Sequence, residues 1–143
     1  MNHFDRQELI RVYLSDAEES LALIEQSLIA LEETPDGSAE LIGEIFRGAH
    51  TLKGNSASLG FDDLTHLAHA MEDLLDEMRA GRLAARRDIV TLLLRSCDAF
   101  RRMMPAAIEG QDGMPVAREF IESLARAKET GEAAQGPSAA SEF

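Results

Sequence analysis

The stretch IRVYLSDAEESLALIEQSLIALEETPDG, residues 10–37, carries the pattern that decides the fold. Its apolar residues recur in alternating steps of four and three, a spacing that places them along one face of a helix. These residues are Ile10, Leu14, Ala17, Leu21, Ile24, Leu28 and Leu31. The turn-forming sequence of residues 34–37 follows them. We therefore expect a helix over about residues 4–33 that buries one face in a core.

The rest of the chain continues with helical patterns and shows no strand pattern. The expected helices cover about residues 38–60, 62–80, 86–108 and 115–129. Ser38 is a plausible N-cap, Gly81 a terminating residue, and Pro105 should kink or stop its helix. Because the connections are short, neighbouring helices should run antiparallel. We predict an all-α fold, an up-down four-helix bundle with an additional C-terminal helix.

Length and charge narrow the possible functions. The chain has 143 residues, enough for one core, and a formal net charge of −12 from 14 basic and 26 acidic side chains. A chain this acidic is repelled by phosphate backbones and anionic lipids, so we expect no nucleic acid and no membrane as partners. A partner with a basic rim is more plausible. No apolar run approaches the roughly 20 residues of a membrane span.

Two further features bear on domain organisation and compartment. Residues 1–129 are expected to form one domain, and the Gly/Ala/Ser/Pro-rich residues 130–143 a flexible linker or tail that ends in a pair resembling a cloning remnant. The single cysteine, Cys97, excludes an internal disulfide, fits a reducing compartment, and is expected to be buried in its helix. We expect a cytoplasmic, monomeric domain.

The sequence AHTLKGNSASLG, residues 49–60, places two glycines in a helical pattern, where each costs about 0.5–1 kcal/mol relative to alanine. Gly43, Arg47, His50 and Gly54 share a stripe beside the core face. One interpretation is that Gly54 lowers the surface so that another molecule can approach the imidazole of His50. The other is that the glycine marks a fraying helix end. Periodicity alone leaves both open.

The next expected helix carries His66, His69, Glu72, Asp73 and Asp76 on its polar side. Such a face is usually just solvated. Antiparallel packing would nevertheless bring Glu72 beside His50. A carboxylate hydrogen-bonded to one imidazole N–H fixes the tautomer and leaves the other nitrogen outward as a nucleophile. If Glu72 bonds Nδ1–H, that nucleophile is Nε2. Lys53, one turn from His50, would meet the oxygens of an incoming phosphoryl group as a point charge.

These residues resemble a known family. The sequence HTLKGNSASLG, residues 50–60, is similar to the signature of histidine phosphotransfer (HPt) domains. The sequences IFRGA, residues 45–49, and HAMEDLLDEMRAG, residues 69–81, resemble more narrowly the N-terminal P1 domain of CheA-type chemotaxis kinases. The resemblance covers about residues 5–128. One position departs from it: chemotaxis versions often have Gly-Gly after the lysine, whereas Gly54-Asn55 here resembles stand-alone and hybrid-kinase domains.

The resemblance implies a bundle and a phosphocarrier role. His50 would accept a phosphoryl group from an ATP-dependent histidine kinase domain, in cis or in trans, and pass it to an aspartate of a CheY-like or CheB-like response-regulator receiver domain. Glu72 would hydrogen-bond His50, with Lys53 and His69 completing the polar network. The receiver would bring Mg²⁺, so this chain should bind no metal or cofactor of its own. The residues expected to dock partners are Gly43, Arg47, Gly54 and Ser56.

Other classes of function remain open. The sequence contains no GxxxxGK[ST] loop for ATP, which favours a carrier over a complete kinase. A metal-binding bundle would use His50, His66, His69 and Glu72. Bundle di-iron sites, however, use inward Glu-x-x-His pairs, and here the order is reversed on a polar face. A structural interaction bundle with solvated histidines is the last alternative.

Overall fold

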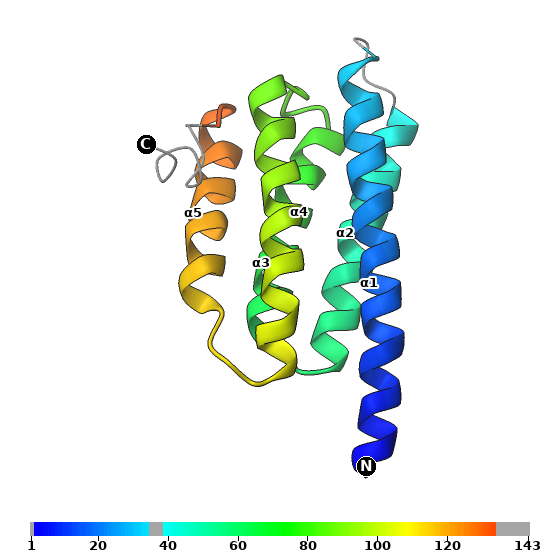
Figure 1. Cartoon of the computed structure of the whole chain (residues 1–143). Coiled ribbons are helices and arrows are strands. Elements are labelled where there is room, and N and C mark those ends of the chain that lie inside the picture. Colours follow the sequence, from blue (N-terminus) through cyan, green and yellow to red (C-terminus); the bar gives the residue numbers. More distant parts are fainter. Residues whose placement is uncertain (1, 35–38, 134–143) are drawn as a thin grey trace.

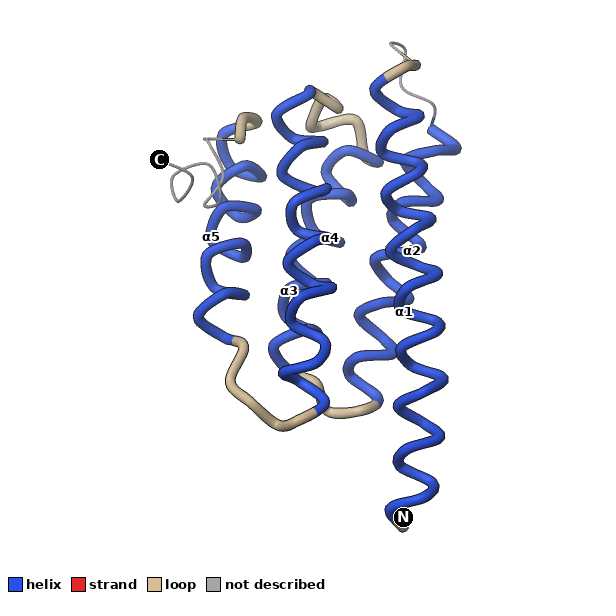
Figure 2. Tube along the Cα trace, in the orientation of Figure 1, coloured by secondary structure: helices blue, strands red, loops and turns tan. Residues whose placement is uncertain are grey.

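The computed structural model describes residues 2–34 and 39–133, and within them the chain is helical without strands (Figures 1 and 2). The helices are α1 (His3–Glu32), α2 (Ala39–Ser58), α3 (Asp62–Arg79), α4 (Arg87–Ile108) and α5 (Met114–Thr130). The predicted all-α class is confirmed. The N-cap predicted at Ser38 and most of the predicted tail lie outside the described residues.

Consecutive helices run antiparallel and form the predicted up-down bundle (Figure 1). α1 packs against α2 and α4, and α3 packs against the same two helices, so α1 to α4 close a four-helix bundle. α5 lies outside it and covers the side formed by α3 and α4. The long α1 projects beyond the other helices at its N-terminal end. The largest interhelical contact joins α2 to α3, the two helices that carry the candidate site residues.

The predicted apolar seam of α1 is correct over its second half and wrong near its start. Ala17, Leu21, Ile24 and the leucines that follow are buried, but Leu14 is 37% exposed and Tyr13 is buried instead. The seam repeats every 3.5 residues, whereas the helix turns every 3.6, so the buried face drifts over several turns. The Tyr13 hydroxyl hydrogen-bonds Ser56 Oγ at 2.8 Å, and its ring meets Phe61 edge to face at 5.2 Å.

Glycine ends α2 and α3 as predicted, while proline does not end α4. Gly60 and Gly81 have φ values of +75° and +79°, a left-handed conformation that glycine adopts without steric cost. α4 continues through Pro105 to Ile108, the end predicted for this helix, so the proline itself does not stop it. Proline removes only its own N–H, and the helix ends within one turn, where Glu109 N–H donates to the Pro105 carbonyl at 3.2 Å.

Candidate functional site

His50 lies on the outer side of α2, beside residues that anchor the helix in the core. Ala49 and Leu52 are fully buried, whereas the His50 side chain is 64% exposed. The apolar neighbours therefore fix the backbone while the imidazole remains accessible. The helix continues without a break to Ser58, so the interpretation of Gly54 as a fraying helix end is wrong.

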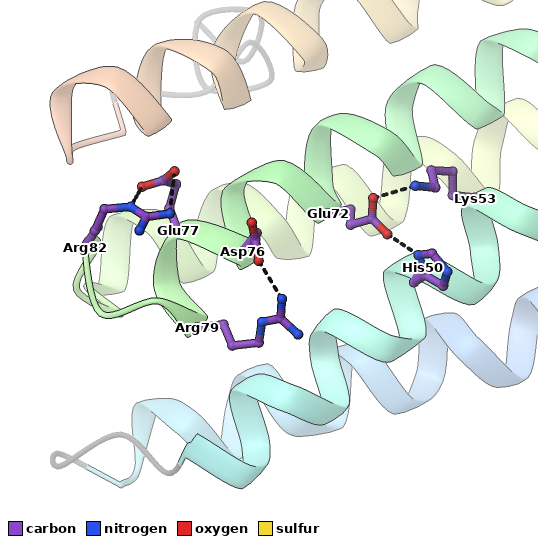
Figure 3. Close-up of polar contacts among 7 residues, drawn as sticks. All are labelled: His50, Lys53, Glu72, Asp76, Glu77, Arg79 and Arg82. Carbon is purple, nitrogen blue, oxygen red and sulfur yellow. Dashed lines mark hydrogen bonds and ion pairs between the residues drawn. The ribbon is translucent and has the colours of Figure 1, made fainter.

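Glu72 of α3 reaches across the helix pair with both carboxylate oxygens engaged (Figure 3). Oε2 hydrogen-bonds His50 Nδ1, and Oε1 accepts from Lys53 Nζ at 2.6 Å. The Glu72 side chain is only 10% exposed. The juxtaposition of Glu72 and His50 that antiparallel packing suggested is therefore present, and Lys53 completes a three-residue cluster.

The electrostatics of this cluster keep Glu72 ionised. Burial by itself raises the pKa of the Glu72 carboxyl, but hydrogen bonds from Lys53 and His50 and their charges outweigh it and lower the pKa below its ordinary value. An ionised carboxylate only accepts hydrogen bonds, so Nδ1 of His50 carries the proton. In the neutral form of the ring, Nε2 then holds the lone pair. No described residue hydrogen-bonds Nε2, so the cluster holds the ring at Nδ1 and leaves Nε2 available at an exposed position.

Gly54 leaves the surface next to His50 low. Apart from its chain neighbours and the nearby backbone of its own helix, a Cβ atom built there would meet no atom within 4 Å, so glycine is not required by packing. Gly48, by contrast, sits in a tight contact, because a Cβ there would lie 2.7 Å from Cγ1 of Ile24 in α1. One glycine of α2 thus serves helix packing, and another opens the surface beside the imidazole.

A shallow concavity lies on the N-terminal side of His50. Its lining residues are Phe46, Arg47, His50, Thr51 and Glu72. The Phe46 and His50 rings are nearly parallel, with an interplanar angle of 12° and centroids 6.3 Å apart. Cζ of Arg79, the last residue of α3, lies 4.0 Å from the Phe46 ring centroid. In the sequence, Phe46 stood out only as part of the IFRGA motif, and its position one turn before the histidine was the signal available for this contact.

Two predicted site residues do not lie where they were expected. Ser56 is fully buried and hydrogen-bonded to Tyr13, so it cannot dock a partner. Two residues turn the helix by about 200°, which places Ser56 on the face opposite Gly54. His69 is exposed and pairs with Asp73, Nε2 to Oδ1 at 3.5 Å, rather than bonding His50 or Glu72. Asp73 lies one helical turn after His69 on the same face of α3, so it is the carboxylate within reach of this histidine. Arg47 is exposed and lines the concavity, and a Cβ atom built at Gly43 would lie 3.4 Å from its Nη1; their docking role stays a prediction.

A metal-binding arrangement finds little support in this cluster. Among the described residues, His69, Glu72 and Asp73 bring possible ligand atoms within 4.8 Å of one another. Both oxygens of Glu72 are already held by His50 and Lys53, and the Lys53 ammonium would repel a cation. His66, which the metal hypothesis also used, is exposed and does not belong to the group.

The comparison with known proteins defines the class. Residues 8–108 match the family described as Hpt domain, and the chain belongs to this family. It is similar to the chemotaxis protein CheA of Borreliella burgdorferi, at 38% identity over 107 residues, which cover 75% of this chain and 12% of that protein. CheA of Bacillus subtilis is 36% identical over 109 residues, covering 76% of this chain and 16% of that protein.

One solved structure is similar to this chain in both amino-acid sequence and fold. The phosphorylated P1 domain of CheA3 in complex with CheY6 from R. sphaeroides has a TM-score of 0.70 and 30% identity, covering 83% of this chain and 97% of that one. The resemblance to P1 domains is confirmed. The chain spans only 12–16% of the length of the two CheA relatives. In the described part of the chain, no helix combines the length and apolar character needed to cross a membrane.

Proposed function

We propose that this domain is a phosphocarrier of a two-component chemotaxis system, in which His50 accepts and then donates a phosphoryl group. The single observation that carries the proposal is the His50–Glu72 pair. It fixes Nδ1 with a buried carboxylate on an otherwise exposed ring and leaves Nε2 open to solvent. Membership of the Hpt domain family and similarity to a phosphorylated P1 domain support it.

The two steps follow from the geometry of the ring. In the first, the lone pair of Nε2 attacks the γ-phosphorus of ATP held by a kinase domain, the bond from phosphorus to the β–γ bridging oxygen breaks, and ADP leaves. The ring gains positive charge, which Glu72 stabilises through the Nδ1 proton. In the second, an aspartate oxygen of a receiver attacks the same phosphorus, the P–N bond breaks, and the electron pair returns to Nε2.

Lys53 and Gly54 are assigned supporting roles. The Lys53 ammonium is 27% exposed and is held 2.6 Å from Glu72 Oε1, one helical turn after His50. From there it would offset charge on the phosphoryl oxygens. The open surface at Gly54 lets the receiver bring its aspartate to the phosphorus, because donor and acceptor must nearly touch for in-line transfer.

The partners follow from the same chemistry. The donor is an ATP-dependent histidine kinase domain, and the acceptor is a CheY-like or CheB-like receiver, which would bring the Mg²⁺ that its aspartate chemistry needs. This sequence has no ATP-binding loop, so the domain must meet a kinase domain that binds ATP. Because that kinase uses cytoplasmic ATP, we place the domain in the cytoplasm. The complex of the similar P1 domain with CheY6 supports a receiver as the acceptor.

One observation favours a second candidate within the same chemistry. Gly54-Asn55 follows the lysine where chemotaxis domains often have two glycines. A stand-alone or hybrid-kinase phosphorelay domain would use His50 identically but would serve other receivers. Transfer rates to a CheY-like receiver and to a phosphorelay receiver separate the two candidates, because each domain should phosphorylate its own partner faster by tenfold or more, about 1.4 kcal/mol in the barrier.

The deciding experiment is phosphorylation of the domain by a CheA-type kinase domain with labelled ATP. Wild type should acquire label that is labile in acid and stable in alkali, and should lose it when a receiver is added. His50→Gln should acquire none, whereas His66→Gln, which changes another exposed histidine, should behave as wild type. Equal labelling of wild type and His50→Gln would place the acceptor elsewhere, and no labelling by any of several kinases would reject the carrier role.

A further inference from the structure

One hydrogen bond does not fix the plane of an imidazole. The Glu72 carboxylate holds Nδ1 of His50 at a single atom, and the ring torsion of histidine is intrinsically broad. The direction of the Nε2 lone pair depends on the ring plane as well as on the position of Nδ1. A ring that is 64% exposed gains little restraint from surrounding protein. A second contact is therefore needed to aim the nucleophile.

Phe46 provides such a contact. Its ring lies nearly parallel to the imidazole, at 12° and with centroids 6.3 Å apart, within the range of offset aromatic pairs. Phe46 is only partly buried and is itself held by α3, because the Arg79 guanidinium lies 4.0 Å from its centroid in a cation–π contact. Arg79 in turn donates to Asp76 Oδ1 at 2.8 Å, which ties the guanidinium down (Figure 3).

We propose that Phe46 is a positioning residue for His50, and that Arg79 acts through Phe46 rather than on the phosphoryl group. This inference rests on the proposed function. α3 then restrains the imidazole in two ways. Glu72 keeps the proton on Nδ1 and fixes the position of that atom. Arg79 holds the Phe46 ring, which in turn fixes the plane of the imidazole. Both restraints come from one helix, so the orientation of the nucleophile depends on the packing of α2 against α3.

The test uses phosphoramidate, a small phosphodonor that needs no protein docking. Phe46→Leu keeps apolar bulk but loses the aromatic face, and should label His50 about three- to tenfold more slowly, at unchanged donor KM. Phe46→Tyr keeps the ring and should label at the wild-type rate. Leu94→Ala is the matched control, because Leu94 is also partly buried but lies on α4, which packs against α1, α3 and α5.

A spectroscopic readout separates positioning from loss of fold. In nitrogen-15 spectra, His50 of Phe46→Leu should keep the wild-type tautomer, because Glu72 still binds Nδ1, while relaxation of the ring should show larger motion. A change of tautomer, or ring motion equal to that of wild type, would overturn the inference. Should Phe46→Leu lose its helical circular dichroism, the surface variant Arg79→Gln takes its place in both measurements.

A double-mutant cycle tests the route through Phe46. Arg79→Gln should slow labelling in the wild-type background and have no further effect in Phe46→Leu. An equal effect of Arg79→Gln in both backgrounds would mean that the guanidinium acts directly on the donor, which overturns that part of the proposal. If wild type is labelled at His50 and Phe46→Leu is labelled at the same rate, the positioning role of Phe46 is overturned while the carrier function stands. Failure of the kinase to label wild type would instead reject the carrier function.

Discussion

At the scale of single residues, the carboxylate of Glu72 joins the chemistry of the site to the stability of the helix pair. Its two oxygens hold His50 and Lys53, both on α2, from a position that is 10% exposed on α3. The two hydrogen bonds compensate the cost of burying the charge. The same contacts that hold the His50 ring at Nδ1 therefore also join α2 to α3.

This coupling predicts a pH-dependent effect of Glu72→Gln. Because contacts with Lys53 and His50 lower the pKa of Glu72 below its ordinary value of 4.5, the ionised carboxylate stabilises the folded state above that pH. Wild type should exceed the variant in free energy of unfolding at pH 7 by about 1–2 kcal/mol. The difference should shrink as pH falls through the lowered pKa, since protonation then removes the same charge from wild type. Urea denaturation between pH 7 and pH 3 measures it.

The control for this titration is Glu19→Gln, which removes an exposed carboxylate of α1. Its difference from wild type should stay within about 0.5 kcal/mol, as for most surface substitutions. A Glu72→Gln difference that stayed constant down to pH 3 would show that the amide disturbs packing, and that the charge of Glu72 contributes nothing measurable.

Gly54→Leu should separate access from folding. Leucine favours helix over glycine by up to about 1 kcal/mol, and its Cβ meets no atom within 4 Å, so thermal stability should hold or rise. Phosphotransfer to a receiver should slow by about tenfold or more, because the side chain holds the two domains apart. Labelling by phosphoramidate, which is small, should change little. Loss of helical circular dichroism would point to a structural glycine instead.

At the scale of helices, sequence periodicity predicted what depends on local geometry. The extents of α3 and α4 and the terminating glycines follow from local sequence patterns, and they were predicted correctly. The exchange of Leu14 for Tyr13 was missed, because it depends on where Ser56 and Phe61 lie in space. The burial of Ser56 and the contact of Phe46 with His50 also require the positions of other helices or side chains.

The pairing of α1 with α2 predicts that Gly48→Ala is destabilising, in contrast to Gly54→Ala. A Cβ at Gly48 would lie 2.7 Å from Cγ1 of the fully buried Ile24, which cannot move aside freely. Overpacking of this kind costs about 1–3 kcal/mol, whereas alanine at Gly54 should stabilise by up to about 1 kcal/mol. Urea denaturation of the two variants gives opposite signs. Stabilisation in both would mean that α1 shifts to accept the methyl group.

At the scale of the whole molecule, Cys97 reports on opening of the core. Its side chain is fully buried in α4, and burial raises the pKa of the thiol well above its ordinary value. An aromatic disulfide reagent should therefore react only after unfolding. The reaction rate should rise with urea in parallel with the loss of helix measured by circular dichroism. A rate independent of urea would reveal local opening of α4 from the bundle.

The contact between α1 and α4 closes the four-helix arrangement, and charge contributes to it. Arg101 of α4 donates from Nε to both oxygens of Glu18, at 3.0 and 3.1 Å. Its terminal nitrogens donate to the two oxygens of Glu25, at 3.1 and 2.9 Å. Hydrogen bonds to Glu25 and then Glu18 raise the pKa of Arg101. Two fork-shaped contacts from one guanidinium are geometrically specific, unlike an ordinary surface pair.

Arg101→Gln should therefore weaken the closure of the bundle and leave the site intact. We expect a loss of about 1–2 kcal/mol in the free energy of unfolding, because the charged hydrogen bonds are removed from a partly exposed position. The loss should be smaller in 1 M salt, where the Debye length is about 3 Å. Urea denaturation at low and high salt measures both values. Labelling of His50 should keep its wild-type rate, since α2 and α3 hold the site and Arg101 joins α1 to α4. A salt-independent loss would assign the stabilisation to packing of the arginine stem.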